Sequence, residues 1–392
     1  MLKNIKFCDI IIFVLKALHF GAGKIGRGFI GAVLAQAGYE VVFVDAQTLV
    51  VEKINHQRGY CVHLVGNQTV VQRVEGVSAL ATDDESVVEN FATVDLVTTA
   101  VSMGRLADVA PIVARGIERR CSAGVTAPIN IICCENGIRA TSVLRDLVYV
   151  QLSAEAQSYA DEFVGFADCG VDRIVPIVTL EQPLDVVVEP YFEWCIDRTA
   201  IKGALPQLAV AHFVDNIDAY ISRKLFTLNT AHCTTAFLGA LKGYKYIHEA
   251  ICDSHIRQIV SGVMRECGAA LVRKFDMEPE EQQKYAETIL QRFANQRLGD
   301  TVSRVSRDPK RKLSPGLYFS HPISMAQQTG VEVDYLATAV AAALKCRNAD
   351  DPQCLELGEM IAQKGVENTV REVCKIEDSG VLARIAARYF DF

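Results

Sequence analysis

The sequence lacks an excess of positive charge. Its 392 residues include 40 lysines and arginines against 47 aspartates and glutamates, which gives a net charge of −7 at pH 7. Proteins that bind nucleic acid neutralise its phosphates with a surplus of basic side chains, so we expect no nucleic-acid partner. Half of the residues are hydrophobic and 22% are charged. The chain can therefore bury a large core, and its length predicts two domains.

The sequence also lacks the closely spaced cysteines of a metal-binding or redox motif. Thirteen cysteines are spread from Cys8 to Cys374, and none of them forms a Cys-x-x-Cys pair. An odd number spread over a long chain is typical of reduced thiols in an intracellular protein. We therefore predict a cytoplasmic protein without a structural disulfide.

Long apolar runs that could span a membrane are missing as well. Residues 1–15 only partly resemble an export signal, because Asp9 interrupts their apolar residues and no convincing cleavage site follows. We interpret them as an extension of unclear role. The uncharged run 225–241 is shorter than the roughly 20 residues that cross a bilayer, and it contains Asn229 and His232. We interpret this run as a helix buried in protein, and we expect no membrane partner.

The clearest motif is a glycine-rich turn between a short apolar strand and a helix. Residues 16–20 run into the motif Gly21-Ala22-Gly23-Lys24-Ile25-Gly26. In such a motif the first glycine permits a tight turn, the second lets the backbone approach a pyrophosphate, and the third lets the helix pack closely on the strand. The pattern predicts a dinucleotide-binding site at these six residues.

An acidic residue ends the next predicted strand, 40–44. Asp45 lies about 20 residues after the last glycine, where a carboxylate accepts hydrogen bonds from the adenosine ribose hydroxyls. No arginine occupies the two positions after Asp45. A 2′-phosphate would therefore meet a negative charge without a cation, which favours NAD over NADP. A role of Asp45 as a simple cap of the strand stays open.

Strand and helix signals alternate through the first half of the chain. Segments 94–101 and 129–134 are predicted to be buried parallel strands, with a helix near 105–119 between them. Residues 60–77 have the pattern of an antiparallel hairpin inserted after the second strand. The fold class is therefore α/β, with a Rossmann-type doubly wound sheet in residues 1–200.

Two polar residues of these strands and their ends are candidates for the site. Asn136 follows the strand 129–134, and open α/β sheets place their ligands at the carboxyl ends of strands. Asn136 could equally belong to a plain Asn-Gly turn, since spacing alone does not separate the two interpretations. Thr99, in the strand 94–101, is a further cofactor-binding candidate.

From about Lys202 onward helical patterns dominate, including 218–242, 255–275 and 280–293. Residues 201–392 are therefore predicted to form a mostly helical substrate and catalytic domain. The first of these helices carries Lys224, and the chain changes architecture here.

Lys224, Asn229 and His232 are predicted to share one side of that helix. At about 100° per residue, the asparagine and the histidine lie roughly 140° and 80° around the axis from the lysine. The uncharged residues that follow indicate a helix enclosed by protein, and desolvation lowers a lysine pKa toward the neutral range that a general base requires. The alternative is a lysine that reaches solvent beside two buried polar residues.

Six segments in a fixed order make the chain recognisable: KALHFGAGKIGRGFIG, VDLVTTAV, NIICCEN, VDRIVP, KGALP and KLFTLNTAH. Together they resemble the polyol-specific long-chain dehydrogenase/reductase family, over nearly the whole chain from Lys16. The resemblance implies a Rossmann domain joined to a helical domain, a reaction without a metal, and NAD-dependent interconversion of D-mannitol 1-phosphate and D-fructose 6-phosphate.

The resemblance also implies roles for individual residues. Lys224 would take the hydroxyl proton, and His232 would orient the substrate. Asn229 and Asn136 would hydrogen-bond the developing oxyanion. Asp172 stands where the family has an acidic residue near the active site.

A sugar phosphate needs at least one basic side chain, and residues 297–312 hold six basic residues against two acidic ones. Arg311 is the preferred phosphate ligand, with Arg304 and Arg307 as further candidates, because arginine offers a planar fork of donors. A solvated loop is the alternative interpretation of this run.

Three other functions compete with this one. The first is another polyol or hexuronate reductase of the same family, and the second is a regulatory protein that binds NAD without catalysis. The third is a zinc-dependent polyol dehydrogenase, but clustered Cys, His and acidic ligands are missing from the sequence. The protein is expected to be a monomer or a small homo-oligomer.

Overall fold

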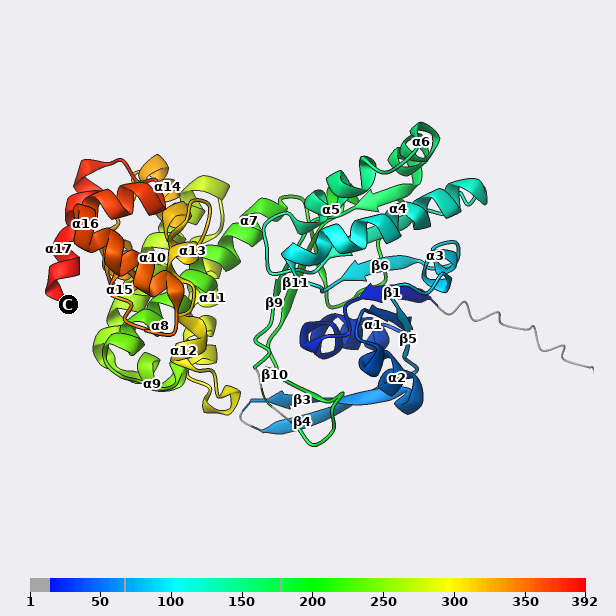
Figure 1. The fold of residues 1–392 in the computed structure, drawn as a ribbon, viewed down its shortest axis with the longest axis horizontal. Helices are drawn as coiled ribbons and strands as arrows, with labels where there is room; N and C mark the ends of the chain where they lie inside the picture. Colours follow the sequence, from blue (N-terminus) through cyan, green and yellow to red (C-terminus); the bar gives the residue numbers. More distant parts are fainter. Residues whose placement is uncertain (1–14, 67, 177, 179) are drawn as a thin grey trace, which may run out of the picture. The chain divides into compact units, whose positions relative to one another are not determined.

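The computed structural model describes residues 15–66, 68–176, 178 and 180–392, which form two compact units. The first unit ends at Ile217 and the second begins at Asp218 (Figure 1). This boundary lies later in the chain than the expected one between residues 200 and 201. The reason is that strand β12 (His212–Val214) still pairs with β11 (Glu193–Asp197) of the first unit. The predicted extension, residues 1–15, lies outside the described residues except for Leu15.

The centre of the first unit is a parallel six-stranded sheet in the order β5-β2-β1-β6-β7-β8. The strand order reverses between β1 and β6, and open α/β sheets bind ligands at the carboxyl ends of strands at such a switch point. The six strands are β1 (Lys16–Phe20), β2 (Glu40–Asp45), β5 (Ser78–Ala81), β6 (Leu96–Thr99), β7 (Ile129–Cys133) and β8 (Val164–Phe166).

Helices cover both faces of this sheet (Figure 1). Successive residues of a strand point to opposite faces, so each strand contributes side chains to two cores. Ala17 of β1 belongs to the core under η1 (Gly26–Ile30), α1 (Gly31–Gln36) and α2 (Thr48–Gln57). Leu18 and Phe20 belong to the core on the other face. That face is covered by α3 (Ser86–Asn90), η2 (Met103–Arg105), α4 (Leu106–Ser122), α5 (Ala140–Tyr149) and α6 (Ala154–Phe163). The predicted Rossmann-type architecture is confirmed.

Two small sheets complete the first unit. The predicted hairpin forms β3 (Gly59–Val65) and β4 (Thr69–Glu75), and β10 (Val186–Val188) adds a parallel strand to β3. The other sheet has the order β12-β11-β9, with β9 at Cys169–Asp172. A short 3-10 helix, η3 (Arg198–Ala200), follows β11.

The second unit is helical, as predicted, and α8 (Thr230–Leu241) lies at its centre. This helix packs against α9, α10, α12 and α15, and most of its residues are buried. No helix in the described part of the chain has both the length and the apolar composition needed to cross a bilayer. The remaining helices are α7 (Ile217–Arg223), η4 (Lys224–Asn229), α9 (Ile247–Cys252), α10 (Ser254–Phe275), α11 (Pro279–Phe293), η5 (Gln296–Leu298), α12 (Val302–Val305), α13 (Pro309–Leu313), α14 (Ser320–Thr329), α15 (Asp334–Leu344), α16 (Pro352–Cys374) and α17 (Ser379–Asp391).

A π-helical turn interrupts the continuous α-helix that was expected at 218–242. In this turn, η4, the N–H of Thr230 donates to the carbonyl of Leu225 five residues earlier. Residues five apart are therefore about one turn apart. Asn229 consequently lies nearly above Lys224, instead of roughly 140° around the axis as an α-helix would place it. The π-turn brings these two predicted catalytic residues to the same side of the helix more closely than the sequence indicated.

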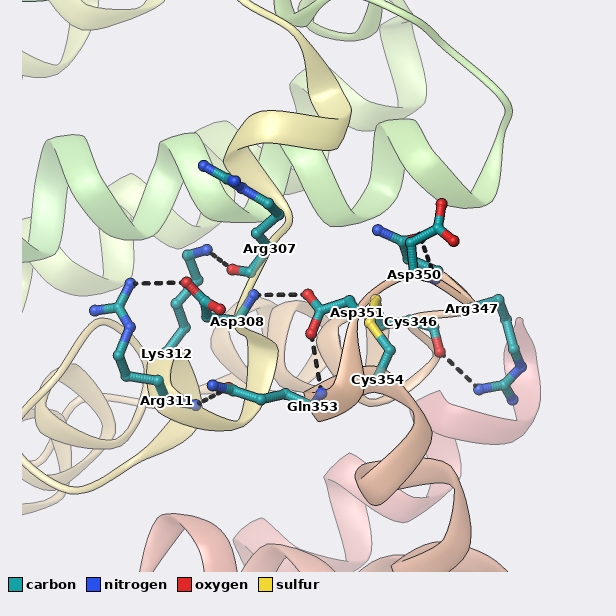
Figure 2. The surroundings of a disulfide bond; sticks show 11 residues. Arg307, Asp308, Arg311, Lys312, Cys346, Arg347, Asp350, Asp351, Gln353 and Cys354 are labelled. Carbon is teal, nitrogen blue, oxygen red and sulfur yellow. Dashed lines mark hydrogen bonds and ion pairs between the residues drawn. A yellow bond between two sulfur atoms is a disulfide. The ribbon is translucent and has the colours of Figure 1, made fainter.

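One cysteine pair contradicts the prediction that the thiols are reduced and unpaired. Cys346, which follows α15, forms a disulfide with Cys354 in the first turn of α16 (Figure 2). The Cα atoms of Cys346 and Cys354 are 5.5 Å apart, within the range that a disulfide spans. The ten other cysteines in the described residues are free thiols. A separation of eight residues matches no spacing motif, so the pairing follows from the fold and not from the sequence pattern.

Candidate active site

The predicted dinucleotide-binding turn lies between the carboxyl end of β1 and the start of η1. Gly21 has a φ of +99°, in the left-handed region that favours glycine. A Cβ atom on Gly26 would overlap the carbonyl oxygen of Gly21, so this close approach also requires glycine. A Cβ atom on Gly23 would meet no atom within 4 Å. Gly23 therefore leaves open space that a phosphate group can approach.

A cavity of about 570 Å³ opens beside this turn. The ends of β1 and β2, the segment after β6 and the start of α4 line it, and Gly21, Gly23 and Asp45 are part of its wall. Backbone amides at a helix start and a carboxylate at the end of β2 are the donors and acceptors that bind a pyrophosphate and a ribose. The residues present therefore fit a dinucleotide.

Asp45 holds the glycine turn against β2. Its Oδ2 accepts a hydrogen bond from the N–H of Ala22 at 2.7 Å, and its Oδ1 accepts one from the N–H of Gln47 at 2.8 Å. Each carboxylate oxygen has a second lone pair, so Asp45 can still accept a ribose hydroxyl. The structural role left open by the sequence and the ribose-binding role are compatible.

Two basic side chains join the glycine turn to the backbone carbonyls of Val178 and Leu184. Lys24 donates from Nζ to the carbonyl of Val178 at 3.1 Å. The buried side chain of Arg27 donates from Nε to the carbonyl of Leu184 at 2.8 Å and also contacts the carbonyl of Ala22. Arg27 was not among the predicted site residues, because an arginine after the last glycine carries no pattern of its own.

Thr99 and Asn136 lie at the ends of neighbouring strands, as predicted. Thr99 is fully buried, and its hydroxyl donates to the carboxylate of Glu135 at 2.8 Å. Glu135 also accepts the N–H of Val101 at 2.9 Å, and burial raises the pKa of this carboxyl group above its ordinary value. Thr99 thus supports the segment that lines the cavity. Asn136 is exposed after β7, whereas Asp172 is buried at the end of β9.

In the second unit, the three residues of the predicted catalytic cluster lie on the less buried side of η4 and α8. Within the described stretch 226–239, Asn229 and His232 are the two residues that are not fully buried. Lys224, one turn earlier, is half-buried as well. Core-facing residues account for the rest of this stretch, so the polar side chains share the side that the core does not cover.

The buried hydroxyl of Thr227, within η4, accepts a hydrogen bond from Gln282 Nε2 in α11 at 2.8 Å. This contact connects the wide turn to a neighbouring helix.

Tyr318 connects the catalytic cluster with the basic region. The side chains of Arg311 and Asn229 lie close to its hydroxyl. Burial raises the pKa of Tyr318, and these two neighbours partly oppose that effect. Asn229 Oδ1 is buried and has no hydrogen-bond partner among the described residues. Because a buried acceptor without a donor costs free energy, this oxygen fits the hydroxyl of a bound substrate.

His232 is held between an aromatic ring and a carboxylate. Its imidazole stacks on Phe293, with ring centroids 4.8 Å apart, and its Nε2 lies 2.9 Å from Asp300 Oδ2. This is the distance of an ion pair, although the two groups are not aligned for an ideal hydrogen bond. A carboxylate beside one imidazole nitrogen fixes the orientation of the ring and its tautomer.

Asp300 is buried, and Arg304 donates from Nε to its Oδ1 at 2.7 Å. Burial alone would raise the pKa of Asp300, but the neighbouring His232 and Arg304 outweigh it and lower that pKa below its usual value. The carboxylate therefore stays ionised over the whole neutral range.

The three candidate phosphate ligands have different surroundings. Arg311, on α13, is about half exposed, pairs with Asp308 at 3.8 Å and lies near Tyr318 and Asn229. Arg304 is engaged with Asp300. Arg307 is exposed, and Figure 2 shows its side chain extending apart from that of Arg311. Of the three, Arg311 has the surroundings that best match the predicted role.

The structure adds Lys312 to the candidate site. Its ammonium is buried and contacts the carbonyl of Arg307, and burial lowers the pKa of this lysine. Its charge acts on Cys233, the residue next to His232.

Asp300, Tyr318 and Lys312 were not identified from the sequence because the contacts that define them join distant parts of the chain. Within the described residues, no group of three His, Cys, Asp or Glu side chains could hold a metal ion.

A glycine-rich turn on a parallel sheet, followed by a helical unit with a polar cluster, defines a two-domain oxidoreductase of the Rossmann class. The match to known families makes this more specific. Residues 15–210 match the mannitol dehydrogenase Rossmann domain, and residues 216–389 match the mannitol dehydrogenase C-terminal domain. The chain belongs to the mannitol dehydrogenase family.

Two solved structures have a similar fold. One is mannitol 2-dehydrogenase of Pseudomonas fluorescens in a ternary complex with NAD and D-mannitol, with a TM-score of 0.73 and 18% identity over 96% of this chain and 91% of the other. The second is a D-sorbitol dehydrogenase in substrate-free form, with a TM-score of 0.80 and 17% identity over 96% of this chain and 93% of the other. At these identities the likeness concerns the fold.

Proposed function

We propose that the protein is a mannitol-1-phosphate 5-dehydrogenase, which interconverts D-mannitol 1-phosphate and D-fructose 6-phosphate with NAD. The observation that carries the proposal is that Arg311 lies near Tyr318 and Asn229 and acts on Cys233, the residue next to His232. This arrangement brings a guanidinium group close to the Lys-x4-Asn-x2-His motif, and arginine is well suited to bind a phosphate through two donors. Membership of the mannitol dehydrogenase family supports a polyol substrate.

In the proposed reaction, Lys224 is the general base for oxidation of the alcohol. Its neutral amine accepts the proton of the C5 hydroxyl, and Asn229 stabilises the alkoxide as it forms. His232, oriented by Asp300 and Phe293, hydrogen-bonds a substrate hydroxyl. NAD, when bound, would supply the hydride acceptor for the oxidation at C5. No metal takes part in this mechanism.

In the first unit, the turn from Gly21 to Gly26 would hold the pyrophosphate through backbone amides, and Asp45 would hold the adenosine ribose. Asn136 is proposed, from the family resemblance, as a second donor to the oxyanion. Its exposed position after β7 is compatible with that role.

The direct test is oxidation of NADH by the purified protein with fructose 6-phosphate as substrate, in the presence of a chelating agent. We expect turnover with fructose 6-phosphate and much slower turnover with fructose. The reverse reaction should prefer mannitol 1-phosphate to mannitol. Faster turnover of an unphosphorylated polyol or of a hexuronate would assign the protein to another reductase of the family. NADH binding without any turnover would indicate a regulatory protein.

Replacing Asp45 with asparagine should narrow the preference for NAD over NADP about tenfold, which corresponds to roughly 1.4 kcal/mol. Asparagine keeps an oxygen that can accept the N–H of Ala22 but removes the charge that repels a 2′-phosphate. The measurement is the ratio of kcat/KM values for the two coenzymes. Equal wild-type activity with NAD and NADP would contradict the role of Asp45.

Replacing Asp300 with asparagine should lower kcat/KM for fructose 6-phosphate about tenfold, because the neutral amide no longer fixes the imidazole of His232. The KM for NADH should stay unchanged, since the dinucleotide-binding residues belong to the other unit. Glu356→Gln, which removes the surface partner of Lys310, is the matched control and should have little effect. A normal kcat/KM for D300N would remove Asp300 from the positioning of His232.

The same variant should change how stability depends on pH. The lowered pKa of Asp300 means that its carboxylate stabilises the fold above the ordinary aspartate pKa of about 3.9, and that this contribution disappears as the pH falls through the lower folded value. The difference in unfolding free energy between wild type and D300N should therefore be larger at pH 7 than below pH 4, as measured by urea denaturation.

A further inference from the structure

The Cys346–Cys354 disulfide lies beside the helix that carries Arg311 and Lys312 (Figure 2). Both cysteines are buried, with 9% and 3% exposure, and the exposed part of the loop 347–350 separates them. The disulfide joins the end of α15 to the first turn of α16. The disulfide can therefore fix the first turn of α16 against α15, most of whose residues are buried.

The first turn of α16 holds the backbone of α13. The N–H of Asp308 donates to Asp351 Oδ2 at 2.8 Å, and the N–H of Arg311 donates to Gln353 Oε1 at 2.8 Å. Both acceptors lie within the segment that the disulfide closes. These two side chains therefore help to hold α13, and with it Arg311 and Lys312.

The first part of α16 is separated from the rest of the helix. Gly365 has a φ of +79° and a ψ of 169°, which interrupts the helix after Lys364. The segment 352–364 thus lies between a break in the helix and the disulfide. α16 packs mainly on α13 and α17, so the disulfide is the covalent constraint that ties this segment to α15.

We propose that Cys346–Cys354 is a thiol–disulfide exchange site, at which a dithiol controls how firmly α13 holds the substrate phosphate. A thiolate of the dithiol attacks one sulfur atom, the S–S bond breaks, and the second thiol of the reagent closes its own disulfide. The protein gains two electrons and two protons as two thiols, and the dithiol is oxidised. Once the link opens, Asp351 and Gln353 hold the two amides of α13 less firmly.

The proposal has two consequences of different origin. The loosening of α13 follows from the contacts around the disulfide alone. The effect on catalysis rests on the proposed function, because it assumes that Arg311 and Lys312 meet a phosphate group. The two consequences can be measured separately.

The experiment compares the full-length protein before and after treatment with dithiothreitol. Alkylation and mass spectrometry should label Cys346 and Cys354 only after reduction. Amide hydrogen exchange in the segment 308–313 should then become about two- to tenfold faster, the range expected for the loss of one hydrogen bond. The KM for fructose 6-phosphate should rise by a similar factor, while the KM for NADH should not change.

Variants provide the controls. A C346S/C354S double variant should behave like the reduced protein, and dithiothreitol should change it no further. Cys252→Ser, which removes an exposed free thiol, should respond as the wild type does. If the double variant does not fold, the comparison of oxidised and reduced wild type carries the test by itself.

Three results would overturn the proposal. These are alkylation of both cysteines before reduction, unchanged exchange in 308–313 after verified reduction, and an equal response of the double variant to dithiothreitol. Faster exchange without any turnover of fructose 6-phosphate would leave the exchange site in place and refute the proposed function. Turnover of fructose 6-phosphate with unchanged hydrogen exchange would support the proposed function and refute the thiol–disulfide exchange site.

Discussion

Replacing Lys224 with alanine is expected to reduce turnover at least about a hundredfold, the lower end of what general acid–base catalysis contributes. The variant should still bind NADH, because the glycine turn and its cavity belong to the other unit. Turnover is measured as NADH oxidation with saturating fructose 6-phosphate, and coenzyme binding by fluorescence titration. Oxidation of the alcohol needs a neutral amine, so the rate at which the wild type oxidises mannitol 1-phosphate should rise with pH toward a plateau. The variant should lose this pH dependence.

A second lysine provides the control for this experiment. Lys242 follows α8 and forms an ion pair with Asp253 at 2.8 Å, far along the helix from the polar cluster. Lys242→Ala should keep near-normal turnover. If Lys224→Ala also keeps near-normal turnover, Lys224 is not the base, and the reaction depends on another group. Partial recovery of the Lys224→Ala variant by an added primary amine would support the assigned role.

Replacing Arg311 with alanine is expected to raise the KM for fructose 6-phosphate roughly tenfold to more than a hundredfold. The loss of one charged hydrogen-bonding partner costs about 1.5 to 3 kcal/mol. Fructose has no phosphate group, so its binding does not depend on this partner. The preference for fructose 6-phosphate over fructose should therefore narrow by a similar factor. The measurement is kcat/KM for both sugars with wild type and variant.

Arg307 is a matched control for this substitution. It has the same side chain and lies four residues away, but it is exposed and extends apart from Arg311 (Figure 2). Arg307→Ala should leave the preference between the two sugars nearly unchanged. If Arg311→Ala has no effect either, the phosphate is held elsewhere, and Lys312 and Arg304 become the next positions to change.

Local patterns were sufficient to predict the architecture of the first unit. The strand at 16–20 was expected from a short apolar run before a glycine turn, and the structure has β1 at Lys16–Phe20. The hairpin was expected from turn residues between two strand patterns, and β3 and β4 form it. In each case the side-chain periodicity and the turn chemistry are properties of residues close together in the chain.

The environment of the candidate site could not be predicted in the same way. Residues 224–229 have the composition of an ordinary helix, and the π-turn is accompanied by a contact from Gln282, which is far along the chain. Asp300 counted as one charge among several until the fold placed it beside His232. Tyr318 carried no signal in the sequence, because its importance depends on contacts with Asn229 and Arg311.

The π-turn makes the alignment of Lys224 and Asn229 depend on the conformation of the backbone as well as on the residue types. One residue more per turn acts as a phase shift of about 100° between the residues before η4 and those of α8. If residues 224–229 adopted regular α-helical geometry, Lys224 and Asn229 would lie about 140° apart around the axis, whereas deletion of one residue within 225–228 would leave them four positions and about 40° apart. A homologue that keeps the five-residue spacing but tightens this turn to an α-helix would therefore retain every catalytic residue type and still lose the alignment of base and oxyanion donor.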